Sequence, residues 1–131
     1  MAMQFANVWE RVSDTVGDNI ALINGDKELS WSQLDVKAAK IATILEEYGL
    51  KSDSKVGIYL HNSHEYLEAQ YGVFKIEGVP INVNYRYKEN ELIYLLDNAD
   101  AEAVFFQGCY SERIKAIKDQ LPKIKVYIPV S

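Results

Sequence analysis

The chain has 131 residues, of which 48% are hydrophobic and 25% charged, and its formal net charge at pH 7 is −5. This length and composition fit one compact domain of an ordinary water-soluble protein. The acidic balance argues against nucleic-acid binding, which needs a basic face to neutralise phosphates. No apolar run reaches the roughly 18 residues of a membrane span, and the N-terminus lacks a secretory signal. Cys109 is the only cysteine and cannot form an internal disulfide, which predicts a cytoplasmic location.

The first predicted elements are a helix and a hairpin. Apolar residues recur at spacings of three and four over residues 4–16, which predicts an amphipathic helix. Residues 20–23 and 28–31 each have the composition of a strand. The Asn-Gly pair in the turn between them, at residues 24–26, is a strong hairpin signal.

Two helices and a buried strand are predicted next. Ser30 and Gln33 have capping-box spacing, and Gly49 is placed to end the helix that they begin. Residues 56–60 are almost all apolar, as in a buried parallel strand. A second helix is predicted over 64–77, with Asn62 as its N-cap. It is apolar on nearly all faces, and we expect this chain alone not to cover it. The first helix has one apolar stripe, formed by Leu34, Ala38, Ile41, Ala42, Leu45 and Tyr48.

The second half of the chain continues the alternation of strands and helices. Gly78 is predicted to end the preceding helix in a left-handed conformation. Residues 79–86 alternate between apolar and polar as in a half-buried strand, and further strands are predicted over 103–106 and 125–130. The predicted fold class is therefore α/β, an N-terminal hairpin followed by strands and helices that form a mostly parallel sheet. Two further helices are marked by Leu92, Leu95, Leu96 and Ala99, and by Ile114, Ile117 and Leu121.

Cys109 is the sharpest candidate for chemistry in the residues themselves. It follows a predicted strand and begins a predicted helix, where the helix dipole favours a thiolate. His61 and His64 follow another parallel strand, and the three side chains could meet at the carboxyl edge of the sheet, where ligands bind. A Cys-His hydrolase is one interpretation. The other is that Cys109 is a small turn residue and that both histidines are solvent-facing loop or cap residues.

Other site types have weaker support. The glycines form no dinucleotide or Walker pattern. The two histidines with Glu65 or Glu68 offer some metal ligands, but a site needs three or four, so no metal site is predicted. The tyrosines at positions 85, 87 and 94 are predicted to cluster around Arg86. Such a cluster is typical of a ligand-stacking surface or of a protein interface.

Three segments in order resemble the adenylate-forming (AMP-binding) enzymes, and among them the fatty-acyl-CoA synthetases. They are DKELSWSQL at 26–34, KVGIYLHNSHEYL at 55–67 and, as the closest, the segment at 78–100 that contains NVNYRY. Together they cover most of the chain, and their order and spacing make the resemblance specific. The family commonly has a proline where His61 stands.

The resemblance implies a parent enzyme that adenylates a carboxylic acid with ATP and Mg²⁺ and then transfers the acyl group to CoA. The family holds ATP with a Ser/Thr/Gly-rich loop that ends in Pro-Lys-Gly, and this sequence has no such loop. Its aromatic-Gly-x-Thr-Glu motif, the aspartate that holds the ribose and the C-terminal lysine are also absent. We therefore expect residues 1–131 to be a single partial domain, the N-terminal subdomain of such a ligase truncated before the ATP-binding loop.

No catalytic, cofactor-binding or metal-binding residue of the family can be placed on this chain. We expect the isolated chain to be an inactive scaffold, whose partners are the remainder of the parent ligase and, through exposed apolar surface, other copies of itself. The carboxylic acid and CoA would bind to the parent. The alternative left open is a free-standing α/β interaction module that has the fold without the chemistry.

Overall fold

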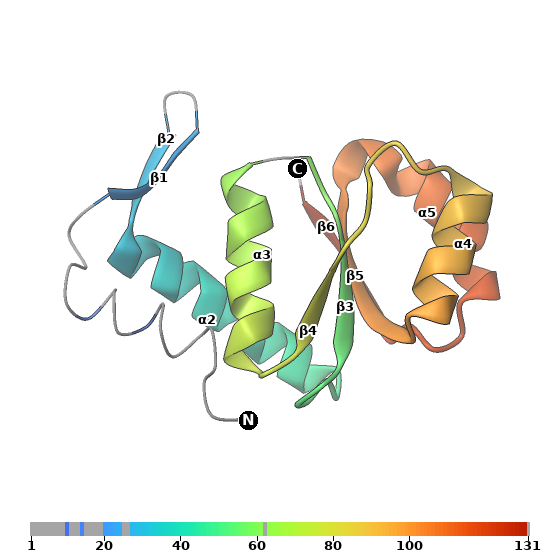
Figure 1. The fold of residues 1–131 in the computed structure, drawn as a ribbon, viewed down its shortest axis with the longest axis horizontal. Coiled ribbons are helices and arrows are strands. Elements are labelled where there is room, and N and C mark those ends of the chain that lie inside the picture. Colours follow the sequence, from blue (N-terminus) through green and yellow to red (C-terminus); the bar gives the residue numbers. More distant parts are fainter. Residues whose placement is uncertain (1–9, 11–13, 15–19, 25–26, 62, 131) are drawn as a thin grey trace.

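A computed structural model describes residues 10, 14, 20–24, 27–61 and 63–130 of the chain. Its centre is a parallel sheet in the order β4-β3-β5-β6. A separate antiparallel hairpin lies beside the start of the first described helix (Figure 1). The predicted α/β class with an N-terminal hairpin is confirmed. The strands are β1 (Ile20–Asn24) and β2 (Lys27–Ser30) in the hairpin, and β3 (Lys55–Tyr59), β4 (Val79–Asn82), β5 (Ala101–Gln107) and β6 (Val126–Val130) in the sheet.

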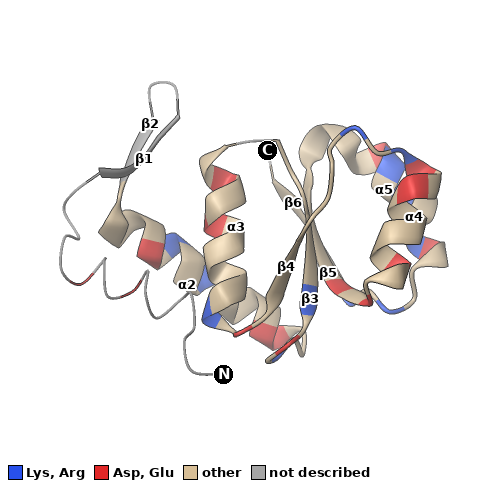
Figure 2. Ribbon diagram, viewed as in Figure 1, with Lys and Arg blue, Asp and Glu red and all other residues tan. Residues whose placement is uncertain are grey.

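Helices cover both faces of the parallel sheet. One face carries α2 (Trp31–Glu47) and α3 (His64–Lys75), and the other carries α4 (Glu89–Asn98) and α5 (Ser111–Ile117) (Figure 1). Short 3₁₀ turns, η1 (Gly108–Tyr110) and η2 (Lys118–Gln120), flank α5. Charged residues lie on the helices, the loops and the strand ends, so the core is apolar on both faces (Figure 2). The core towards α2 and α3 includes Val56, Ile58, Ala103 and Phe105, and the core towards α4 and α5 includes Tyr59, Val104 and Phe106.

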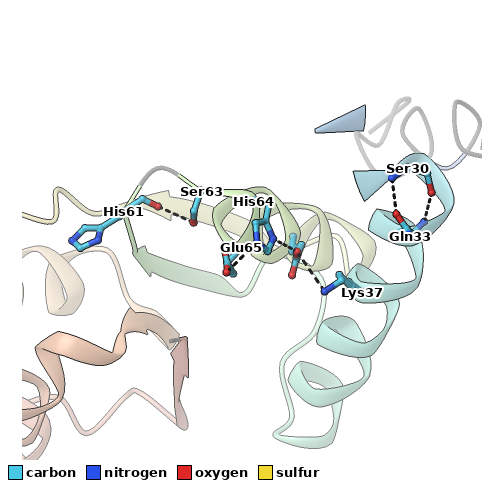
Figure 3. Close-up of polar contacts among 8 residues, drawn as sticks. Ser30, Gln33, Lys37, His61, Ser63, His64 and Glu65 are labelled. Carbon is cyan, nitrogen blue, oxygen red and sulfur yellow. Dashed lines mark hydrogen bonds and ion pairs between the residues drawn. The ribbon is translucent and has the colours of Figure 1, made fainter. Parts of the chain in front are cut away.

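Helix α2 begins and ends as its sequence predicts. The Ser30 hydroxyl accepts a hydrogen bond from the Gln33 amide at 3.2 Å, and the Gln33 side chain accepts one from the Ser30 amide at 2.9 Å (Figure 3). After the helix, Gly49 has a φ of 88°, and the Leu50 amide donates to the Leu45 carbonyl at 3.1 Å. This is the hydrogen bond of a Schellman C-cap. The residues of the apolar stripe predicted for this helix are buried or half-buried, except Tyr48, which is 50% exposed.

Helix α3 is covered within this chain, contrary to expectation. Gly72 allows close contact with α2, because a Cβ there would lie 2.8 Å from the Ile41 Cβ. None of the large hydrophobic side chains that the described residues expose belongs to this helix. Its C-terminus also differs from the prediction. Glu77, with a φ of 61°, takes the left-handed position, and the Gly78 amide donates to the Val73 carbonyl at 2.9 Å.

Three further expectations need correction or fall outside the described residues. The N-cap of α3 is Ser63, whose side chain makes no capping bond, and Asn62 is outside the described residues. The strand predicted over 79–86 ends at Asn82, and the chain then turns at Tyr85 and Arg86. Of the helix predicted over 4–16 the structure describes only Glu10 and Asp14, and both are helical. Within the described part of the chain, every helix is too short or too polar to cross a membrane.

Candidate functional site

The site with the greatest chemical content lies at the carboxyl ends of β3, β4 and β5. The chain leaves β3 through α3 on one face of the sheet and leaves β5 through α5 on the other face (Figure 1). β3 and β5 are neighbours in the sheet, so the topology changes direction between them. Such a switch point opens a crevice beyond the strand ends, which is where open α/β sheets bind their ligands.

An aromatic and basic group of side chains fills this position, and we call it the strand-end cluster. At its centre the His61 Nε2 lies 2.9 Å from the Tyr110 hydroxyl. The His61 ring meets the rings of Tyr110 and Tyr85 edge-on, with centroids 5.5 and 5.1 Å apart. The loops after three strands are thus in mutual contact. The cluster consists of Tyr59, His61, Tyr85, Tyr87, Tyr110 and Arg113.

Arg113 and Tyr59 form the buried side of the cluster. The guanidinium of Arg113 donates to the Tyr59 hydroxyl at 2.7 Å and to the Tyr87 carbonyl at 3.1 Å. Burial raises the pKa of the Tyr59 hydroxyl, and this effect outweighs the opposing hydrogen bond and positive charge of Arg113. Tyr59 therefore keeps its proton and donates it to the Tyr87 carbonyl at 2.7 Å. The side chains of Arg113 and Tyr59 thus fix the backbone at Tyr87.

An open cleft of about 300 Å³ adjoins the cluster. On its wall, Asn82 accepts a hydrogen bond from the Tyr66 hydroxyl at 2.8 Å, and Asn84 accepts one from the Arg86 amide at 2.9 Å. The guanidinium of Arg86 lies over the Tyr85 ring, 5.7 Å from its centroid. The cleft therefore offers a polar wall with one exposed cation at the switch point. It is lined by Leu60, Tyr66, Asn82, Val83, Asn84, Tyr85 and Arg86.

The structure does not assemble the Cys-His site considered from the sequence. Cys109 is exposed in the three-residue turn η1. His61 is at the strand ends, as expected, but His64 is buried on the first turn of α3 (Figure 3). The expectation of two solvent-facing histidines is therefore wrong for His64. Among the described residues, neither histidine forms a hydrogen bond or ion pair with Cys109.

His64 is instead part of an ionic group that joins two helices. Its Nδ1 lies 2.7 Å from an oxygen of Glu68 and its Nε2 lies 3.2 Å from one of Glu65. Lys37 on α2 approaches the same Glu68 oxygen at 4.0 Å (Figure 3). Glu65 and Glu68, the two carboxylates considered as candidate metal ligands, thus both contact the His64 ring. In the described part of the chain, no three His, Cys, Asp or Glu side chains are placed to hold a metal ion.

The described residues also do not fit ATP and Mg²⁺. Magnesium is held in proteins by carboxylates together with phosphate oxygens. Among the described residues, no carboxylate lines the cleft, and the carboxylate beside the strand-end cluster, that of Glu89, pairs with Arg113 at 3.7 Å. The cleft is walled by side chains rather than by a glycine-rich loop of backbone amides. No step of ATP chemistry is therefore assigned to residues of this chain.

The comparison with protein families decides the identity of the chain. Residues 8–131 match the family described as AMP-binding enzyme. The chain belongs to the AMP-binding enzyme family. The family resemblance seen in the three sequence segments is confirmed, and the match extends over almost the whole chain.

Individual relatives of this AMP-binding chain are CoA ligases by name. It is 38% identical over 130 residues to the 3-oxocholest-4-en-26-oate–CoA ligase of Rhodococcus rhodochrous, covering 99% of this chain and 23% of the relative. It is also 38% identical over 130 residues to a medium/long-chain-fatty-acid–CoA/3-oxocholest-4-en-26-oate–CoA ligase of Mycolicibacterium smegmatis, covering 99% and 24%. The chain therefore spans about a quarter of the length of these relatives.

Solved structures agree on the fold. An anthranilate CoA ligase, AuaEII, in complex with anthranoyl-AMP superposes with a TM-score of 0.92 at 20% identity, covering 98% of this chain and 25% of that one. The N-terminal domain of FACL13 from Mycobacterium tuberculosis gives 0.90 at 19% identity, covering 98% and 34%. The AMP-binding chain thus has the fold of part of an acyl-CoA ligase N-terminal domain.

The sequence alone found part of the candidate site. Arg86 does meet Tyr85, as predicted, but Tyr94 is 72% exposed on α4 and belongs to neither the strand-end cluster nor the cleft. Tyr59, Tyr110 and Arg113 were missed. No local sequence signal indicates that they belong to a site, because Tyr59 has the pattern of a core residue in a strand and Arg113 that of an exposed residue on a helix. Only the pairing of β3 with β5 brings the three together.

Proposed function

We propose that the chain forms part of an ATP-dependent ligase that joins a fatty acid to CoA, and that its role in that enzyme is structural. The observation that carries the proposal is the family match over residues 8–131, together with 38% identity to two relatives that are named as CoA ligases. The scaffold role is supported by the described residues, which fit neither ATP nor Mg²⁺ but do build a parallel sheet with an apolar core on each face.

The substrate of the whole enzyme is a medium- or long-chain fatty acid or an acid with a steroid skeleton, as the names of the relatives suggest. The carboxylate is adenylated by ATP with release of pyrophosphate, and the acyl group then passes to the CoA thiol with release of AMP. ATP, Mg²⁺ and CoA bind to the parent, and the remainder of the parent is the partner of this chain. We place the enzyme in the cytoplasm, where the free Cys109 stays reduced.

Two proteins assayed side by side test the proposal, the 131-residue chain and the longer ligase that contains it. Each is incubated with ATP, Mg²⁺, CoA and either a long-chain fatty acid or a steroid acid, and acyl-CoA and AMP are quantified by chromatography. We expect product from the longer protein and none from the isolated chain. Product from the isolated chain would show that the scaffold role is wrong. A longer protein that is folded but inactive with every acid would refute the proposed ligase activity.

Self-association of the isolated chain is a further part of the proposal. Its support is an exposed apolar patch at the end of α2, where Ile44 and Tyr48, the residue after the helix, are 39% and 50% exposed. They are four residues apart, so they lie on one side of the helix. Exposed apolar surface of this kind favours association.

The substitution Ile44→Lys should lower the apparent mass in concentrated solution, because it places a charge in the apolar patch of Ile44 and Tyr48. The control Ala39→Lys adds the same charge at an exposed position outside this patch. Light scattering and sedimentation over a range of concentrations measure the effect. A chain that is monomeric at every concentration would contradict this part of the proposal.

A further inference from the structure

His61 makes contacts to the loops after three different strands. Its ring meets Tyr85, which follows β4, and Tyr110, which follows β5. Its backbone amide donates to the Gln107 side chain at 3.1 Å, at the end of β5. Its carbonyl accepts from the Ser63 hydroxyl at 3.2 Å, next to the start of α3 (Figure 3). One residue therefore fixes the relative positions of all three strand ends.

The segment that these contacts hold is the wall of the cleft. The loop from Asn84 to Tyr87 is held at its first half by the contact of Tyr85 with His61. At its second half, the carbonyl of Tyr87 accepts from Tyr59 and Arg113. Arg86 stands between the two anchors, exposed, with its guanidinium over the Tyr85 ring. The orientation of Arg86 in the cleft thus depends on where Tyr85 is held.

The ring of His61 does more than fill space. Tyr110 packs on Tyr59 with centroids 4.9 Å apart, so it already has an aromatic partner without His61. What His61 adds is the hydrogen bond to the Tyr110 hydroxyl at 2.9 Å and the edge-on contact with Tyr85. These two contacts connect the anchored Tyr59–Tyr110 pair to the cleft wall, which has no other described ring contact to that pair.

We propose that this chain, beyond its structural role, takes one part in substrate binding by the ligase: His61 is a positioning residue that acts through Tyr85 on the Asn84–Arg86 wall of the cleft. The inference rests on the proposed function. If the ring of His61 is lost, the wall samples other conformations, and only the molecules whose wall has the original conformation bind substrate. The apparent affinity for substrate is then multiplied by the fraction of such molecules, while the chemical step that follows binding is unchanged.

Kinetics of the longer ligase give the first test. The substitution His61→Leu removes the ring but keeps the backbone amide that donates to Gln107. We expect it to raise the KM for the acid or for CoA by about three- to tenfold, the effect of one lost hydrogen bond or ring contact. The kcat should stay within about twofold. His61→Phe keeps a ring that can meet Tyr85 edge-on and should restore most of the KM. The control Tyr94→Phe removes a hydroxyl from α4 and should change neither constant.

Three kinetic results would overturn the proposal. They are unchanged KM values in His61→Leu, a fall in kcat at constant KM, and an equal defect in His61→Phe. The first would show that the wall needs no support from His61. The second would place the effect on the chemical step. The third would show that the contact of the ring with Tyr85 has no part in the effect.

Hydrogen exchange in the 131-residue chain gives a second readout that needs no ligase activity. The amides of Arg86 and Tyr87 donate to Asn84 at 2.9 and 3.0 Å. His61→Leu should speed their exchange by about three- to tenfold, the same factor as above, and leave the amides of α2 unchanged. Unchanged exchange at both amides would refute the positioning role even if the ligase is active. Faster exchange in a chain whose longer form has no ligase activity would refute only the proposed function.

Discussion

The contact between α2 and α3 makes a quantitative prediction for Gly72→Ala. The added methyl would lie 2.8 Å from the Ile41 Cβ, closer still to its Cγ2, and 3.2 Å from the Ala38 carbonyl oxygen. Carbon atoms pack at about 3.5–4.0 Å, so the helices must separate. Overpacking costs about 1–3 kcal/mol, and alanine returns about 1 kcal/mol of helix propensity. Because the Ile41 Cβ is attached to the α2 backbone and cannot swing away, we expect a net loss of about 1–2 kcal/mol.

Urea and thermal unfolding followed by circular dichroism measure this loss. For a chain of this length the midpoint temperature should fall by about 4–8 °C, with an unchanged urea m-value. Gln70→Ala on the same helix is the matched control and should stay within about 0.5 kcal/mol. The cost of Gly72→Ala should shrink in an Ile41→Ala background, since the closest clashing atom is gone. An equal cost in both backgrounds, or a stabilised Gly72→Ala protein, would refute the close-packing argument.

Two further predictions concern the ends of α3 and the charges beside it. Glu77→Gly should raise stability by about 0.5–1 kcal/mol in urea unfolding, because Glu77 holds a left-handed φ of 61° that costs a residue with a Cβ; a loss of stability would show that the Glu77 side chain matters more than its backbone. Burial raises the pKa of Asp35, but hydrogen bonds from Tyr71 and Lys75 outweigh it and hold that pKa below its ordinary value. The stability this gives is present above the unfolded-state pKa of about 3.9 and is lost as the pH falls through the folded-state value. In thermal melts, Asp35→Asn should flatten the loss of stability below about pH 4, and an unchanged acid profile would contradict this assignment.

Local signals predicted the elements well because their causes are local. The capping box of Ser30 and Gln33 and the left-handed Gly49 need only residues within one turn, and both are confirmed. The prediction failed where tertiary contacts decide. Gly78 was expected to take the left-handed position, but its lack of a side chain serves a close approach instead, because a Cβ there would lie only 3.0 Å from the Ser54 carbonyl oxygen. Glu77 adopts the left-handed conformation in its place.

The candidate site shows the same division. The segment around Arg86 was recognisable from its aromatic and polar composition, and its contact with Tyr85 is confirmed. Nothing in the sequence showed that Arg113 would bind the carbonyl of Tyr87, because the two lie far apart along the chain. His64 was misplaced for a related reason. Its position at a helix start suggested solvent, whereas it is buried and its ring pairs with Glu68 one turn further along α3.

The strand order of the sheet has a consequence for the synthesis of the protein. β3 and β4 are adjacent and joined through α3, so they can pair as soon as both have left the ribosome. The other edge of β3 pairs with β5, which is synthesised only after the whole of α4. Until then the nascent sheet carries an open edge of apolar residues, a template for wrong pairing with other chains. Correct folding of the sheet therefore requires that residues Ala103 to Phe106 pair with this edge of β3.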